Sequence, residues 1–102
     1  MEIKNIKVDL FGTTVTIQIV DVVKSDDGDD IYGKYNMNTK NIYVARYING
    51  EKLKDSEIKI TILHELVHAI FNIGQYKHSC DDEPLVEWTA RCLFKLINKK
   101  VL

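Results

Sequence analysis

The sequence predicts an α+β fold in which an N-terminal antiparallel β-sheet of about four strands packs on two helices. Two observations predict it. In the first half of the chain, apolar and polar residues alternate at every second position, as they do in strands. In the second half, apolar residues recur at helical spacing in two separate segments.

The first two predicted strands are joined by a turn at residues 11–13, where Gly12 follows Phe11. An extended segment precedes the turn, and its apolar residues are Ile3, Ile6, Val8 and Leu10. The strand after the turn alternates between apolar and polar positions, and its apolar residues are Val15, Ile17 and Ile19. The acidic segment Ser25–Asp30 lacks the ligand spacing of a calcium loop and is expected to be solvated.

A second hairpin is predicted from Ile31–Asn36 and Asn41–Ala45, with a turn at Met37–Lys40 between them. Tyrosines gather in and after this hairpin: Tyr32, Tyr35, Tyr43 and Tyr47. They are expected either to pack across neighbouring strands or to line a cleft whose strand edge pairs with an extended peptide.

The first predicted helix is capped by Asp55 or Ser56, continues to about Ile73 and ends at Gly74. A polar loop, Gln75–Asp82, follows it. The second helix is capped by Asp81 or Asp82, tolerates Pro84 in its first turn and ends with the positive charge of Asn98-Lys99-Lys100.

Residues 1–102 are expected to form one small domain with one core. The formal net charge of −1 gives no electrostatic reason for binding nucleic acid or an anionic membrane. No apolar run is long enough for a membrane span, and the N-terminus lacks the apolar block of a secretion signal. Two cysteines, Cys80 and Cys92, do not indicate a disulfide framework, so a cytoplasmic protein with free thiols is expected.

The first helix contains His64-Glu65-Leu66-Val67-His68, the HExxH pattern. Residues four apart lie on the same helix face, so His64 and His68 can hold one metal ion together. Glu65 lies beside them, where it can handle the proton of a water molecule. The pattern is a signature of zinc-dependent peptidases. Two histidines alone bind Zn²⁺ weakly, so a third ligand is required.

Glu83 and Glu87 are the main candidates for the third ligand. They lie one turn apart beside the apolar stripe of the second helix, as the two histidines do on the first. Two antiparallel helices that pack through these stripes would bring the flanks together into a His₂Glu site. The alternative is that both glutamates are exposed acids near a helix N-terminus, where acids are favoured anyway. His78 is a further candidate, and Cys80 is a minor one.

HELVHAIF followed by EPLVEWTARCLFKLI resembles the small gluzincin-type metallopeptidases. The likeness is to short HExxH proteins of phages and prophages, related to the ImmA/IrrE-like group, and covers roughly residues 32–97. It implies a minimal zincin-like fold with one Zn²⁺, and makes His64 and His68 ligands and Glu65 the general base. Glu83 matches the ligand glutamate of the family, and Glu87 would then orient a zinc-bound imidazole.

Glu87 remains a rival for the ligand position, because Glu87-Trp88-Thr89-Ala90 also fits the family's Glu-x-x-Ala pattern. In the family's pattern an acidic or amide residue follows the alanine, whereas this chain has Arg91 there. Geometry also favours Glu87, because Glu83 lies so close to its helix start that it reaches the depth of the histidines only if the preceding loop first descends.

The expected function is zinc-dependent hydrolysis of a peptide or protein substrate. The resemblance implies a single regulatory protein as the target. The alternative is a non-catalytic zinc-binding regulatory or interaction protein that keeps a metallopeptidase fold. A fourth side chain on the metal, such as His78 or Cys80, would favour that alternative. A third interpretation is an α+β domain that binds no metal.

Overall fold

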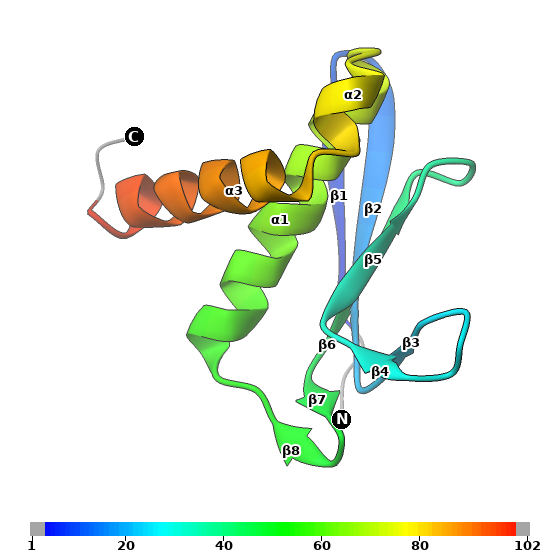
Figure 1. Cartoon of the computed structure of the whole chain (residues 1–102), viewed down its shortest axis with the longest axis vertical. Coiled ribbons are helices and arrows are strands. Elements are labelled where there is room, and N and C mark those ends of the chain that lie inside the picture. Colours follow the sequence, from blue (N-terminus) through cyan, green and yellow to red (C-terminus); the bar gives the residue numbers. More distant parts are fainter. Residues whose placement is uncertain (1–3, 100–102) are drawn as a thin grey trace.

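The computed structural model describes residues 4–99 and confirms the α+β class. Ile3 of the first predicted strand and Lys100 of the predicted helix end lie outside these residues. Figure 1 shows the strands gathered beside α1, with α3 crossing α1. The strands are β1 (Lys4–Leu10), β2 (Thr13–Val20), β3 (Val23–Lys24), β4 (Asp30–Ile31), β5 (Gly33–Asn36), β6 (Asn41–Ala45), β7 (Tyr47–Ile48) and β8 (Glu51–Lys52). The helices are α1 (Asp55–Ile73), α2 (Lys77–Cys80) and α3 (Glu83–Asn98).

The main sheet has four strands in the order β1-β2-β6-β5. Both predicted hairpins are present, because β1 pairs antiparallel with β2 and β5 pairs antiparallel with β6. However, β2 and β6 pair in parallel, from Thr16 opposite Asn41 to Val20 opposite Ala45. The expectation of a purely antiparallel sheet was therefore wrong for the central pair. Residues 21–40 form the long connection that two parallel strands require. β5 lies within this connection and pairs on the outer side of β6, at the edge of the sheet.

The turn between β1 and β2 has its two central residues in the left-handed region, Phe11 at φ 53° and Gly12 at φ 90°. Turns of this kind match the right-handed twist of the strands they join. The backbone N–H of Gly12 also donates to the Asp9 carboxylate at 2.9 Å. Local turn chemistry thus sets the register of the first hairpin.

α1 packs on one face of the sheet and, on another side, against α3. The sheet side is a cluster of buried apolar residues: Val15, Ile17, Ile19, Ile42, Val44 and Ala69. The α3 side is a second buried cluster, formed by Val67, Val86 and Ala90. α1 therefore lies between the sheet and α3.

The helix ends differ in part from the sequence prediction. α1 begins one residue earlier than predicted, because Lys54 is the N-cap and its N–H donates to the Glu57 carboxylate at 3.2 Å. α1 ends before Gly74 as predicted, but Gln75 is the residue with positive φ, at 66°. Of the two caps predicted for α3, Asp81 and Asp82, the cap is Asp82, whose carboxylate accepts from the N–H of Leu85 at 3.1 Å.

Within residues 4–99, none of the helices combines the length and the apolar character that crossing a membrane requires.

Candidate metal centre

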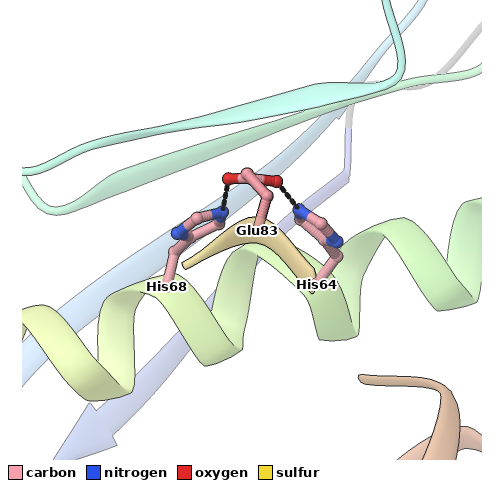
Figure 2. Close-up of side chains that lie close together, drawn as sticks. All are labelled: His64, His68 and Glu83. Atoms are coloured by element: carbon pink, nitrogen blue, oxygen red, sulfur yellow. Dashed lines mark ion pairs between the residues drawn. The ribbon is translucent and has the colours of Figure 1, made fainter. Parts of the chain in front are cut away.

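Three side chains converge between α1 and α3, as Figure 2 shows. His64 and His68 lie one turn apart on α1, and Glu83 is the first residue of α3. Nε2 of His64 lies 3.2 Å from one carboxylate oxygen of Glu83, and Nε2 of His68 lies 2.8 Å from the other. The two imidazoles therefore present the same nitrogen to one carboxylate. We call this group the His/His/Glu triad.

The donor atoms of the triad fit a zinc ion. All three lie within 4.8 Å of one another. Ligands about 2.0–2.1 Å from Zn²⁺ at tetrahedral angles are about 3.3 Å apart. Each Nε2 lies at a similar or shorter distance from one oxygen of the Glu83 carboxylate, His64 from Oε2 and His68 from Oε1. Two imidazole nitrogens and one carboxylate are also the ligand set of several catalytic zinc sites. The triad is thus compatible with an HExxH metal site.

The second ring nitrogen of each imidazole, Nδ1, faces away from Glu83 and has a partner of its own; we call it the outer nitrogen. Nδ1 of His64 lies 3.6 Å from Oε1 of Glu87, and Nδ1 of His68 lies 3.8 Å from Sγ of Cys80. Glu87 is in turn 3.5 Å from Nε of Arg91, one turn further along α3. Metal-binding histidines usually have such a partner on the nitrogen that faces away from the metal.

Glu83 reaches the histidines because the chain between the two long helices first turns back. The N–H of Tyr76 donates to the carbonyl of Phe71 at 2.7 Å, and α2 follows within the segment predicted as a polar loop. α2 packs against α1, and the chain descends beside α1 before α3 begins (Figure 1). Because Asp82 caps α3, Glu83 begins the helix at the level of the histidines. The loop before α3 therefore runs back along α1 far enough for Glu83 to reach the histidines.

Glu65 is buried beside the triad, with 7% of its surface exposed. Burial raises the pKa of its carboxyl from 4.5 to about 7; the neighbouring His64 lowers this pKa and Glu83 raises it. Burial likewise raises the pKa of the Cys80 thiol, with smaller contributions in the same direction from nearby carboxylates. Near neutral pH the Glu65 carboxyl is therefore shared between its neutral and ionised forms, whereas the Cys80 thiol stays neutral.

Gly33 allows β5 to lie against α1 at the level of Glu65. A Cβ atom at this position would lie 2.8 Å from the Thr61 methyl group, 2.8 Å from the Tyr43 backbone oxygen and 3.5 Å from Cγ of Glu65. A side chain here would therefore push the strand and the helix apart. Nothing in the pattern of residues indicates this close approach, because Gly33 lies inside an ordinary strand pattern.

A cleft of about 440 Å³ opens beside the triad. α1 lines it with His64 and Glu65 among other residues, the edge of the sheet lines it with Tyr32 and Gly33, and α3 contributes Glu87 and Arg91. The cleft therefore joins a histidine of the triad to the buried carboxylate and to the edge strand β5. Tyr32 is half exposed in this wall, whereas Tyr35 points elsewhere and donates to Asn72 on α1 at 2.8 Å.

Two residues considered from the sequence lie outside the triad. His78 is exposed on α2, and no hydrogen bond or ion pair within residues 4–99 links it to His64, His68 or Glu83. Cys80 lies on the Nδ1 side of His68, which is the side away from Glu83. Burial of this thiol against His68 is a feature that sequence reasoning missed, because a four-residue helix has no readable periodicity.

Comparisons of the chain with models of protein families, with curated proteins and with solved structures give no match. The described residues form an α+β fold that brings two histidines and a glutamate from two helices to positions where they can bind a metal ion.

Proposed function

We propose that this protein is a zinc-dependent peptidase, with His64, His68 and Glu83 as metal ligands and Glu65 as general base. One observation carries the proposal: a metal-ligating histidine of the triad and the buried Glu65 line the same cleft. A structural zinc site needs neither a cleft nor a buried carboxylate beside its ligands. The HExxH pattern of the sequence supports the same reaction class.

The ligand set supports catalysis over a purely structural ion. Structural zinc sites are closed by four protein ligands, whereas catalytic sites have three and one open position. Within residues 4–99, the metal-ligating group at this place has three members, and neither His78 nor Cys80 is among them. This favours the peptidase over the non-catalytic zinc protein. When bound, zinc supplies a Lewis acid that acidifies water and polarises a carbonyl.

Glu65 has the position and the acidity for proton transfer. It accepts a proton from the attacking water as the oxygen bonds to the scissile carbonyl carbon. It then delivers the proton to the leaving amine nitrogen, and the C–N bond breaks to give a carboxylic acid and an amine. Its pKa of about 7 suits both transfers near neutral pH, because a general base works best when its pKa lies close to the working pH.

The substrate we propose is an extended peptide segment of a protein, bound along β5. β5 is the edge of the main sheet, and its first residue, Gly33, lines the cleft. Edge strands recognise extended peptides through backbone hydrogen bonds. Because Gly33 lies against α1 at the level of Glu65, a peptide paired with β5 would pass close to that carboxylate. The resemblance to ImmA/IrrE-like proteins supports a single regulatory protein as the target.

The test is a comparison of zinc content and peptide hydrolysis in the wild type and the Glu65→Gln variant, purified without an affinity tag. Glu65→Gln should bind zinc normally and lose about 100-fold or more of the rate on a mixture of quenched fluorescent peptides. Glu51→Gln is the matched control, because it makes the same exchange at an exposed position of β8 outside the cleft and should keep the wild-type rate. A fully active Glu65→Gln variant, or a wild type that binds no zinc, would contradict the proposal.

A further inference from the structure

We infer that Cys80 is a positioning residue of the metal site, which holds the His68 imidazole in the orientation and tautomer that a metal ion requires. This inference rests on the proposed zinc site and adds to it a residue outside the ligand set. Cys80 lies on α2, and 6% of its surface is exposed. It is one of two free cysteines, and the other, Cys92, lies on α3.

Two contacts join the Cys80 sulfur to His68. Sγ lies 3.4 Å from the backbone oxygen of His68 and 3.8 Å from its Nδ1 atom. A thiol has a single proton to donate. A carbonyl oxygen can only accept, so the thiol proton goes to the oxygen, and the sulfur lone pairs are left to accept from Nδ1–H.

This assignment favours the tautomer of His68 that carries its proton on Nδ1. When the proton of a neutral imidazole is on Nδ1, the lone pair is on Nε2. Nε2 of His68 is the atom that lies 2.8 Å from Glu83, on the side where the triad converges. When a metal ion lies between Nε2 and the Glu83 carboxylate, the contact with Cys80 favours the tautomer that leaves the Nε2 lone pair for the ion, and the contact with the backbone oxygen anchors the sulfur itself.

His64 has the same arrangement with a different partner. Its Nδ1 faces the Glu87 carboxylate at 3.6 Å, and its Nε2 faces Glu83. Both imidazoles thus have a polar atom behind the outer nitrogen, as metal-bound histidines usually do. Glu87 is half exposed and can carry its charge in contact with water. The position of Cys80 is buried, where an ionised carboxylate would be costly and a neutral thiol is not.

The test is the zinc affinity of Cys80→Ala, Cys80→Ser and Cys92→Ala in the full chain, measured by competition with a chromophoric chelator. Loss of an outer partner typically weakens metal binding about 10- to 100-fold, and we expect this for Cys80→Ala. Cys80→Ser should recover part of the affinity, because a hydroxyl keeps one donor and its acceptor capacity. Cys92→Ala should bind zinc like the wild type.

A second measurement separates positioning from mere packing. Long-range ¹H–¹⁵N NMR spectra of the zinc-loaded wild type should show a proton on Nδ1 of His68 that exchanges slowly with water. In Cys80→Ala this proton should exchange faster, whereas the Nδ1 proton of His64 should not change. A cavity without a role in positioning would alter thermal stability in Cys80→Ala but would leave the tautomer and the exchange unchanged.

The outcomes are distinct. If the wild type binds zinc and Cys80→Ala binds it equally well, the inference about Cys80 is overturned and the proposed peptidase stands. If the wild type binds no zinc, both are overturned. If Cys80→Ala does not fold, Cys80→Ser and the wild-type NMR spectrum decide: a wild-type His68 with its proton on Nε2 overturns the inference.

Discussion

Nε2 of His68 lies 2.8 Å from a carboxylate oxygen of Glu83, and this contact joins the middle of α1 to the first turn of α3. The same carboxylate reaches His64 with its other oxygen. Of the two histidines, Glu87 contacts His64, at the outer nitrogen on the side away from Glu83. The two glutamates that the sequence left as rivals therefore occupy different places around the histidines.

The first prediction is that Glu83→Gln weakens zinc binding more than Glu87→Gln. Glutamine keeps the size of glutamate but removes its charge. A side chain that binds the metal directly contributes more to zinc affinity than one that only orients a ligand. Replacement of an orienting residue costs about 10- to 100-fold in metal affinity, so Glu87→Gln should fall in this range and Glu83→Gln beyond it. Competition titration with a chromophoric chelator measures both. The reverse order would assign the ligand position to Glu87.

The second prediction concerns the pH dependence of the metal-free protein. Folding raises the pKa of Glu65 from 4.5 to about 7, so the folded state binds this proton more tightly than the unfolded state. The stabilisation is complete below pH 4.5 and is lost as pH rises through 7. Because one pKa unit corresponds to about 1.4 kcal/mol, this loss is on the order of 3 kcal/mol.

Glu65→Gln removes the titrating group and keeps its shape. Urea unfolding of the metal-free proteins should therefore show wild-type stability falling relative to Glu65→Gln between pH 4.5 and pH 7. Below that range, the difference between the two proteins should stay constant. Parallel stability curves for the two proteins across the whole range would refute the raised pKa of Glu65.

The third prediction is that Gly33→Ala destabilises the protein and disturbs the site. The new Cβ would lie 2.8 Å from a backbone oxygen of Tyr43, which cannot rotate away. Overpacking of this kind costs about 1–3 kcal/mol. Denaturant unfolding measures the loss of stability, and zinc-dependent hydrolysis should fall as well, because α1 carries Glu65.

Lys34→Ala is the control for Gly33→Ala. Lys34 is the next residue of β5 and is exposed, so its replacement should change stability by no more than about 0.5 kcal/mol. A Gly33→Ala variant as stable as this control would contradict the prediction, because it would mean that β5 and α1 can move apart without loss of folding free energy.

Local patterns in the sequence were enough to place most of the elements. The hairpin turn at Gly12 and the capping of α3 by Asp82 use chemistry that lies within a few residues, and both are confirmed. The helical spacing of the HExxH segment likewise fixed His64 and His68 on one face of α1. These features need no knowledge of the rest of the chain.

Features that depend on distant segments could not be predicted. Alternation of apolar residues in β2 shows which face is buried, but the same pattern fits a parallel or an antiparallel neighbour, so the pairing with β6 was missed. Glu83 and Glu87 share one face of α3, and only the path of residues 75–82 separates their positions. The contact of Cys80 with His68 depends on the same path.

α3 packs against α1 and α2, whereas α1 is also packed on the sheet and tied to it through the Tyr35 hydroxyl and Asn72. An ion held by both histidines and Glu83 would act as a clasp between these two bodies. Such an ion would add to the buried contacts of Val67, Val86 and Ala90 that already hold α3 on α1. Because Glu87 and Arg91 form the α3 wall of the cleft, the ion would also help to hold that wall in place.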